Sequence, residues 1–428
     1  MNAASVRDGL EFRLARTLLV CLVACVAACL ERAHGAPAHP PRAPLDAPAP
    51  PTVSPPLDAA PAPAPPPPSL EDPVSAQGRA ARGLYFSGPY VKRFGAEGVV
   101  RALRRANLDA AVIDLKDDQG RVLFDSQVPV LAASRVPMLG DVRALVTRLK
   151  SEGVYTIARL VCFNDSVVPL AHLDRAVLDR RPGRARRPWV SWGTGTTWLD
   201  PTNPDNHALV RDLAVEVAAF GFDEVQLDYV RFPVDRGTDY AVFPRERAGA
   251  RHWEYLVAML RLVDEAVQVP LGVDLFGISA LRVGDTAGLG QSAEEWAPYV
   301  EVYTPMLYAN NFLTWEAGGD VDRGASFVSA ATQSLRARVG PAPVIRPFLQ
   351  AFATGAERFD ERFIAGQIRA ARRAGADGFL FWNPASKFDM VVRSMRGSGQ
   401  ASAPFPGPAT QPAAPSAAPS AAQPVAPP

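Results

Sequence analysis

The stretch that decides the fold runs from Phe220 to Pro233 and reads FGFDEVQLDYVRFP. Period-two alternation places Glu224, Gln226 and Asp228 on one face of a strand, and apolar or aromatic residues on the other. In a parallel barrel, one strand face points inward, the other packs on helices, and reactive side chains gather at the carboxyl ends of the strands. Asp228 has that position, so we take it as the leading catalytic candidate.

Seven further apolar runs of strand type lie between Arg82 and Arg396, and most are followed by a stretch with helical spacing of apolar residues. They begin at Gly83, Ala110, Tyr155, Pro270, Glu301, Val344 and Gly378. Strand and helix alternating eight times predicts an α/β fold, a single (β/α)8 TIM barrel. A doubly wound open sheet is the alternative, but its usual phosphate-binding loop has only a weak candidate in GTGT at Gly193.

Composition divides the chain into four segments, because the excess of its 42 prolines gathers at the two ends. We predict a leader at 1–35, a disordered Pro/Ala-rich linker at 36–78, the barrel at 79–397 and a disordered Pro/Ala/Ser tail at 398–428. The formal net charge of +1 provides no field that would attract a polyanion. We therefore expect no nucleic-acid partner. We also expect a monomer.

The leader has the pattern of an export signal. Three arginines precede an apolar run from Leu18 to Leu30, which is too short to span a bilayer comfortably. The segment VAAC that ends at Cys29 resembles a bacterial lipobox, and predicts lipidation of Cys29. Lipidation of Cys25, or ordinary cleavage after Gly35, are the alternatives. We expect a cell-envelope protein anchored by lipid to the outer membrane or cell surface, or else a periplasmic or secreted one, with no other membrane contact.

The predicted carboxyl ends of the strands carry carboxylates, amides and aromatic rings. Glycosidic cleavage needs one carboxylic acid and one carboxylate, about 5 to 5.5 Å apart for retention and about 6.5 to 9.5 Å for inversion. Asp228 and Asp274 end neighbouring strands, which lie about 4.8 Å apart, and form our predicted catalytic pair. The other rim residues are expected to bind substrate: Asp114, Lys116, Asp117, Trp198, Asp200, Arg231, Tyr308, Gln350, Trp382 and Asn383.

Structural roles are the alternative for several of these side chains. Asp228 can be an acid capped by Arg231 or Lys116, and Asp114 shares a strand face with Lys116, with which it can form an ion pair. The aromatic residues can be core groups instead of sugar platforms. The acid that partners Asp228 stays open among Asp274, Asp114, Asp117 and Asp200.

Metal and cofactor chemistry is not predicted. The three histidines of the body, at 172, 207 and 252, stand at no strand end and show no HxH or HExxH spacing, which weighs against a zinc deacetylase. Cys162, within a strand, is expected to be a buried apolar residue. The run RRPGRARRP from Arg180 is interpreted as a solvated surface segment.

Six motifs follow one another between Gly83 and about Phe388. They are AVIDLKDDQGRV at Ala111, ARLVCFND at Ala158, WLDPTNPD at Trp198, FGFDEVQLDYVRFP at Phe220, PMLYAN at Pro305 and GADGFLFWNP at Gly375. Together they resemble a family of bacterial barrels provisionally assigned to the glycoside hydrolases and formerly classed as a domain of unknown function.

That resemblance implies a TIM barrel distantly similar to the alpha-amylase clan. It implies a nucleophile at the end of the fourth strand, which is Asp228, and an acid/base at the end of the fifth. There this chain has Asp274 where the clan has a glutamate, and Gln226 stands where the clan has an arginine.

The sequence thus predicts an exported glycoside hydrolase that acts on the O-glycosyl bonds of an envelope or extracellular polysaccharide by a two-carboxylate mechanism. Its partner is the polysaccharide or an oligosaccharide. The alternatives are a carbohydrate-binding barrel without turnover and a structural envelope barrel, since fold alone does not give function.

Overall fold

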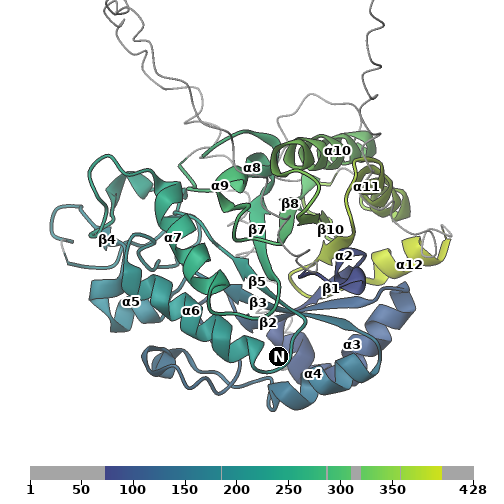
Figure 1. Ribbon diagram of the computed structural model, residues 1–428, viewed down its shortest axis with the longest axis horizontal. Helices are drawn as coiled ribbons and strands as arrows, with labels where there is room; N and C mark the ends of the chain where they lie inside the picture. Colours follow the sequence, from purple (N-terminus) through teal and green to yellow (C-terminus); the bar gives the residue numbers. More distant parts are fainter. Residues whose placement is uncertain (1–72, 185, 286–287, 310–319, 357, 398–428) are drawn as a thin grey trace, which may run out of the picture.

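Eight parallel strands close into a barrel surrounded by helices, which confirms the predicted (β/α)8 fold (Figure 1). The computed structural model describes residues 73–184, 186–285, 288–309, 320–356 and 358–397. In order the strands are β1 (Arg82–Phe86), β2 (Ala110–Lys116), β3 (Tyr155–Val161), β5 (Glu224–Asp228), β7 (Leu271–Phe276), β8 (Val302–Leu307), β9 (Val344–Ile345) with β10 (Phe348–Gln350), and β11 (Phe379–Trp382). Pairing of β8 with β10 and of β11 with β1 closes the ring.

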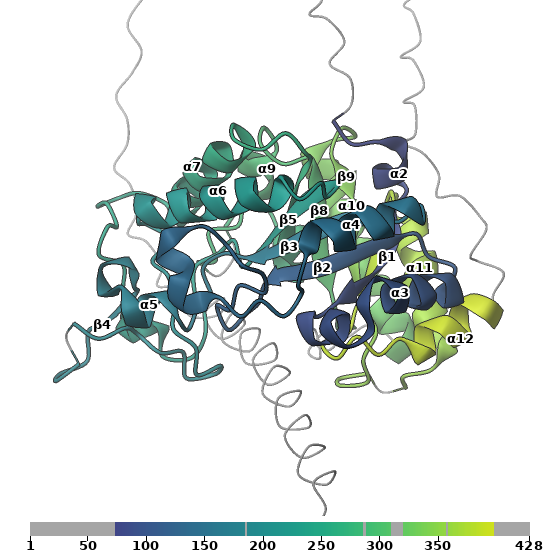
Figure 2. The same ribbon diagram turned by 90° about the horizontal axis from the view of Figure 1, so that it is seen from below.

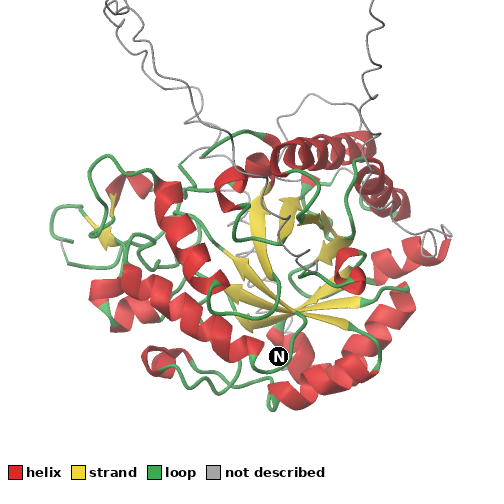
Figure 3. Ribbon diagram, viewed as in Figure 1, coloured by secondary structure: helices red, strands yellow, loops and turns green. Residues whose placement is uncertain are grey.

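Helices cover the outside of this barrel (Figure 3). The longer ones are α3 (Gly88–Ala106), α4 (Val142–Ser151), α6 (Pro204–Ala218), α7 (His252–Asp264), α10 (Asp320–Val339), α11 (Glu361–Arg373) and α12 (Asp389–Gly397), and the short ones include α8 (Gly277–Leu281) and α9 (Ala293–Trp296). Three of them have an N-cap residue whose side chain accepts a hydrogen bond from a backbone N–H of the first turn, namely Asp141, Asn203 and Asp360. None of the described helices is long and apolar enough to cross a membrane.

The structure confirms the predicted alternation of inward and outward side chains within FGFDEVQLDYVRFP. Val225 and Leu227 belong to the apolar core between the strands and the helices. Glu224, Gln226 and Asp228 point into the barrel, where each meets a polar side chain of another strand. The barrel interior is therefore a stack of polar layers beside a smaller apolar cluster, and Asp228 lies in the layer at the carboxyl ends.

The floor of the barrel is a buried ion pair. Both carboxyl oxygens of Glu224 lie 2.5 Å from Nη2 of Arg346, and Tyr155 donates a hydrogen bond of 3.1 Å to the same carboxylate. A side chain at Gly272 would place its Cβ 2.8 Å from Glu224 Oε1, so glycine makes room for the pair. Buried side chains stay charged when they are paired and hydrogen-bonded. The pair of Glu224 and Arg346 closes the end of the barrel opposite Asp228.

The chain enters at this floor, through α2 (Ala76–Arg79). Arg346 Nη1 donates a hydrogen bond of 2.8 Å to the Gly78 carbonyl. Val74 packs on Val302 and Val344, which begin β8 and β9. In Figure 2, α2 lies on the same side of the molecule as β9. The segment that leads out of the proline-rich linker is thus attached to the end of the barrel that lies away from the carboxyl ends of the strands.

Two long connections at the carboxyl ends join into one extension. The connection after β3 contains α5 (Val168–Ala171) and β4 (Leu178–Asp179), and the connection after β5 contains β6 (Ala241–Val242). These two short strands pair antiparallel. In Figure 1, β4 lies at the edge of the molecule, away from the barrel axis. Cys162, at the start of this extension, is buried as predicted.

Candidate active site

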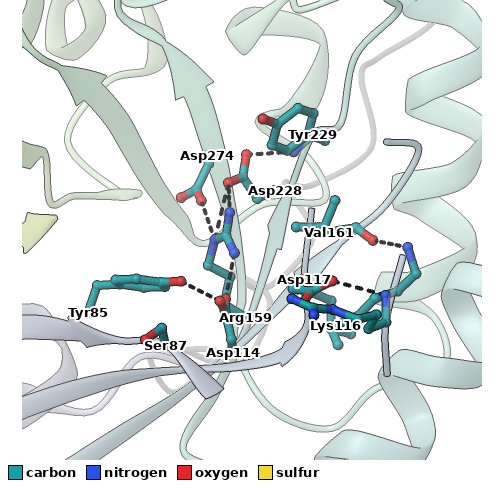
Figure 4. Close-up of polar contacts among 12 residues, drawn as sticks. Tyr85, Ser87, Asp114, Lys116, Asp117, Arg159, Val161, Asp228, Tyr229 and Asp274 are labelled. Carbon is teal, nitrogen blue, oxygen red and sulfur yellow. Dashed lines mark hydrogen bonds and ion pairs between the residues drawn. The ribbon is translucent and has the colours of Figure 1, made fainter. Parts of the chain in front are cut away.

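Three aspartates surround one arginine at the carboxyl ends of the strands (Figure 4). Arg159 Nη1 lies 2.5 Å from Asp114 Oδ1, and Arg159 Nε lies 3.1 Å from Asp228 Oδ2 and 3.9 Å from Asp274 Oδ2. All four side chains are buried. We call Arg159, Asp114, Asp228 and Asp274 the carboxylate cluster. One guanidinium cannot neutralise three carboxylates, so the cluster favours keeping at least one of them protonated.

Arg159 is the central residue that the sequence reading missed. It has the inward parity of β3, and it pairs in register with Asp114 on one side and Gln226 on the other. The resemblance implied an arginine at position 226, where this chain has Gln226. The guanidinium that contacts Asp228 comes instead from Arg159, on the neighbouring strand β3. The signal was available in the sequence, because an arginine inside the apolar run YTIARLV must find buried partners.

Asp228 accepts hydrogen bonds on both of its oxygens. Arg159 donates to Oδ2 from Nε and Nη2, and the backbone N–H of Tyr229 donates to Oδ1 at 2.6 Å. Tyr229 has φ of +54°, a left-handed conformation that is costly for a residue with a large side chain. This strain accompanies an N–H that turns back to the carboxylate, so the donors that stabilise negative charge on Asp228 are preorganised.

Asp274 has the opposite environment. It is 1% exposed, and no N–H or O–H group among the described residues donates a hydrogen bond to either of its carboxyl oxygens. Burial, followed by the charge of Asp228, raises the pKa of Asp274 well above its ordinary value, and the opposing charge of Arg159 is too weak to reverse this. A proton on Asp274, hydrogen-bonded to Asp228, satisfies both groups. Two carboxyl groups with such different surroundings divide into an acid and a base.

The separation of the two carboxyl groups is bounded by their shared contact. Since Asp228 Oδ2 lies 3.1 Å and Asp274 Oδ2 lies 3.9 Å from Arg159 Nε, the two oxygens are at most about 7 Å apart. Retaining glycosidases use about 5 to 5.5 Å and inverting ones about 6.5 to 9.5 Å. The hydrogen bond between the two groups brings their nearest oxygens well inside this bound, closer to the retaining than to the inverting separation, and keeps the pair within reach of one glycosidic bond.

Tyr85 and Asp114 complete the cluster on the β1–β2 side. The Tyr85 hydroxyl donates to Asp114 Oδ2, and burial followed by the Asp114 charge raises the pKa of Tyr85. Burial also raises the pKa of Asp114, against the opposing charge of Arg159. Asp114 is thus held by a guanidinium on one oxygen and a phenol on the other, an arrangement that fixes the orientation of Arg159 toward Asp228.

A further acid at the rim, Asp118, was also missed. It follows β2 in a turn that Gly120 closes by donating to the Asp117 carbonyl, and its side chain is half-buried. Burial and then the charge of Asp117 raise the pKa of Asp118 to about 6. A partly accessible carboxyl group with that pKa is a second candidate for the acid. Its sequence signal was the doubled aspartate of the LKDDQG motif, of which only the first was singled out.

Two of the predicted substrate-binding aromatic residues lie beside the cluster. The rings of Tyr308 and Trp382 stack with centroids 5.5 Å apart, and Tyr85 lies 6.1 Å from Trp382. Trp382 is half-buried, whereas Tyr308 is fully buried. Trp382 therefore offers part of an aromatic face at the rim, and Tyr308 supports it from below.

Trp198 and Arg231 are brought together away from solvent. The Arg231 guanidinium lies 4.7 Å from the centroid of the Trp198 ring, 4.9 Å from that of Tyr229 and 4.8 Å from that of Phe276. Trp198 is 1% exposed. It presents no open face to a sugar in this structure, and instead supports the loop that holds Tyr229 next to Asp228.

The alternative of an ion pair between Asp114 and Lys116 is not what the structure has, and neither is the alternative of Asp228 capped by Lys116 or Arg231. A register shift between Asp114 and Lys116 turns Lys116 to the outer side of the barrel, where its Nζ lies 2.9 Å from Asp165 Oδ2 and 2.8 Å from the Val161 carbonyl. Arg159 takes the role of cap for both Asp114 and Asp228. A bulge in a strand is not readable from alternation alone.

The remaining predicted binding residues hold the rim loops. Asp117 pairs with Arg121 at 2.6 Å, and Asp200 accepts hydrogen bonds from the backbone and hydroxyl of Thr202. Gln350 donates to the carbonyls of Phe352 and Thr354, and Asn383 donates to the Ala351 carbonyl. Each of the four side chains thus uses hydrogen-bonding groups in contacts within the protein. These contacts all lie outside the carboxylate cluster.

The described ranges contain no group of three or more His, Cys, Asp or Glu side chains arranged to hold a metal ion. The carboxylate cluster holds an arginine at its centre, where a cation would otherwise balance the aspartates.

Replacing Arg159 by methionine is expected to destabilise the protein by about 3 to 5 kcal/mol at pH 7, because it leaves buried carboxylates without a counter-charge. The loss should be smaller at pH 5, where the raised pKa values of Asp114 and Asp274 favour their neutral forms. Urea unfolding at both pH values measures this. Arg148→Met, which breaks the surface pairs with Glu97 and Glu152, is the control and should cost about 1 kcal/mol or less. An equal loss in both variants would contradict the role of Arg159.

Comparison with known proteins adds a family and a fold. A family model described as "Putative glycosyl hydrolase domain" matches residues 83–388. No curated protein matches the sequence significantly. A hypothetical protein from Ruminiclostridium thermocellum is 29% identical over 45% of this chain and 96% of its own, with a TM-score of 0.40. The glycoside hydrolase domain of PgaB (BpsB) from Bordetella bronchiseptica is 15% identical over 72% of this chain and 94% of its own, with a TM-score of 0.53. At that identity the second similarity concerns the fold.

Proposed function

Since the match spans residues 83–388, the chain belongs to this glycosyl hydrolase family, and we propose that it is an exported enzyme that cleaves an envelope or extracellular polysaccharide with Asp228 and Asp274 as its two carboxyl groups. The observation that carries the proposal is the contrast between these neighbours. Asp228 accepts donors on both oxygens, whereas Asp274 accepts none among the described residues and favours its protonated form.

In this mechanism Asp274 donates its proton to the glycosidic oxygen as the bond to the leaving sugar breaks. Asp228 either attacks the anomeric carbon or takes a proton from a water molecule that does so. Arg159 and the Tyr229 N–H donate hydrogen bonds to Asp228 and fix the orientation of its carboxyl group until then. Trp382, half-buried beside the cluster, supplies an aromatic face on which a pyranose ring can pack.

The direct test is an assay of the purified full-length protein against a panel of bacterial envelope and extracellular polysaccharides, with new reducing ends as the readout. We expect reducing ends from at least one of them. Binding of a panel member without reducing ends, at any pH between about 4 and 8, would favour the carbohydrate-binding alternative.

Export and lipidation belong to the proposal, and Cys29 with residues 1–35 lies outside the described residues. The attachment of α2 to the barrel floor supports an anchor at the N-terminal side, because an incoming linker then approaches the end opposite Asp228. The polysaccharide would reach the site from the side facing away from the anchor.

Cys29→Ser is expected to abolish incorporation of labelled fatty acid and to release the protein from the membrane fraction, because a lipobox cysteine carries the lipid. Cys25→Ser is the matched control and should retain both. Loss of the label from Cys25→Ser alone would move the site to Cys25, and label in neither wild type nor variant would mean that no lipid anchor exists.

A further inference from the structure

The extension beside the barrel carries two exposed aromatic rings that the apolar core does not use. Trp192 is 52% exposed and Tyr240 is 39% exposed. Their rings stack with centroids 5.6 Å apart and an interplanar angle of 30°. The rings come from different connections, one following β3 and the other following β5, so the pairing of β4 with β6 brings them together. Exposed large aromatic residues that gather in one place commonly mark an interaction site.

This ring pair is held in position. The Arg181 guanidinium lies 5.4 Å from the Trp192 centroid and 5.7 Å from the Tyr240 centroid, and Asp179 fixes the arginine through two contacts of 2.9 Å. Gly237 has φ of +88°, and a Cβ there would lie 2.7 Å from the indole ring of Trp192. The backbone therefore supports the indole directly. Rings fixed in this way lose little conformational entropy when a ligand packs on them.

The run RRPGRARRP, interpreted from the sequence as a solvated segment, passes this ring pair: the Arg181 guanidinium lies over both rings, and the Arg180 backbone N–H donates a hydrogen bond of 2.9 Å to the Tyr240 carbonyl. The exposed arginines are Arg180, Arg184, Arg186 and Arg187. In the described ranges none of these four side chains forms an ion pair, and the nearby Asp179 is occupied by Arg181. Asp239 and Glu246 are the exposed acids among the described residues of the facing connection. The surface thus combines an apolar platform with a surplus of guanidinium groups, which bind carboxylates through paired hydrogen bonds.

We infer that this surface, the Trp192 platform, is a second binding site for an anionic polysaccharide with carboxylate groups. The platform consists of Trp192, Tyr240, Arg181 and the four exposed arginines. Pyranose rings would pack on the two aromatic side chains, and sugar carboxylates would pair with the arginines. This inference rests on the proposed function, and it specifies an acidic substrate class for it.

A glycan is favoured over other polyanions by where the platform lies. The two connections that carry it leave β3 and β5, the strands that supply Arg159 and Asp228, so a chain held there stays at the catalytic end of the barrel. Single-stranded nucleic acid also uses aromatic stacking and basic grooves. The formal net charge of +1 gives no wider field for any polyanion, polyuronates included, so attraction to the platform is local to its arginines, and poly-dT binding is a competing outcome of the test.

The test measures binding of the full-length Asp228→Asn protein, which prevents turnover, to alginate and to polygalacturonate by affinity electrophoresis at low and physiological salt. Dextran is the neutral comparison, and poly-dT is the nucleic-acid comparison. Trp192→Ala should weaken binding to at least one polyuronate about tenfold or more. Arg184→Gln with Arg187→Gln should weaken it several-fold and reduce its dependence on salt. The matched control, Leu170→Ala, removes another exposed apolar side chain of the extension and should change nothing.

Several outcomes overturn the inference: binding of neither polyuronate, equal binding by Trp192→Ala, equal affinity for dextran, or tighter binding of poly-dT that depends on Trp192. Hydrolysis by the otherwise wild-type protein is measured separately. If the protein hydrolyses a panel member but its binding does not depend on Trp192, the platform inference is wrong and the proposed enzyme stands. Trp192-dependent binding without hydrolysis of any panel member defeats the proposed enzyme alone and leaves the platform standing.

Discussion

Asp228→Asn is expected to lower kcat on the substrate found in the panel by a factor of about 10³ or more. The amide keeps the shape of the side chain but carries no charge, so it can neither attack the anomeric carbon nor take a proton from water. It also leaves Arg159 facing a neutral group, although Asp114 still accepts from that guanidinium. Binding should change little, because the sugar rings are held by other side chains. Initial rates and isothermal titration with the same oligosaccharide measure the two effects.

The matched control for this variant is Asp200→Asn. Asp200 is equally buried, but its carboxylate accepts hydrogen bonds from Thr202 outside the carboxylate cluster. It should keep at least one tenth of the wild-type kcat. If Asp228→Asn retains more activity than Asp200→Asn, Asp228 is not the reacting carboxylate. Thermal unfolding of both proteins shows whether either loss comes from the fold.

Asp274→Asn is expected to lose most of its activity on unactivated glycosides and yet to be more stable than wild type at pH 8. Activity falls by a factor of about 10² or more because the leaving oxygen loses its acid. Stability rises because the pKa of Asp274 is raised in the folded state, mainly by burial. The unfolded chain ionises this group above about pH 4, whereas the folded protein must keep the proton or bury a charge. The wild-type protein therefore loses stability as pH rises through the folded pKa, and the variant does not.

Urea unfolding from pH 4 to pH 8 checks this second effect. The difference in free energy of unfolding between variant and wild type should grow with pH and reach about 1 kcal/mol or more, since one unit of pKa shift corresponds to about 1.4 kcal/mol. A pH-independent difference would mean that Asp274 is not protonated in the folded protein.

Asp118→Asn separates the two candidate acids. If Asp274 is the acid, Asp118→Asn keeps most of the activity and the alkaline limb of the pH–rate profile stays in place. If Asp118 is the acid, that limb lies near its pKa of about 6 in the wild type and Asp118→Asn removes the activity. The second result would assign Asp274 to positioning Asp228 and leave Asp228 as the nucleophile or base.

The eight strands and the inward parity of Glu224, Gln226 and Asp228 could be predicted because both depend on local periodicity. A period of two decides which face of a strand a residue occupies, and strand–helix alternation leaves few ways to arrange parallel strands. The same reasoning placed Asp114, Asp228 and Asp274 at one end of the barrel, and the structure brings these three together around Arg159.

Other features of the site depend on contacts between strands and loops distant in the sequence. The bulge in β2 sends Lys116 outward to Asp165, and the register of β3 against β2 and β5 sets Arg159 between two carboxylates. Pairing of β4 with β6 likewise brings Trp192 and Tyr240, from two separate connections, together beside the basic run in the Trp192 platform.

By itself, then, the sequence determined the barrel and put Asp228 at the catalytic end, because these follow from spacing within single elements. Only the tertiary structure decided which charges meet: Arg159 with Asp228, and Asp274 with no donor among the described residues. The physical reason is that electrostatic roles depend on distance and burial. Both are set by the register of neighbouring strands and by the loops above them, which local periodicity does not encode.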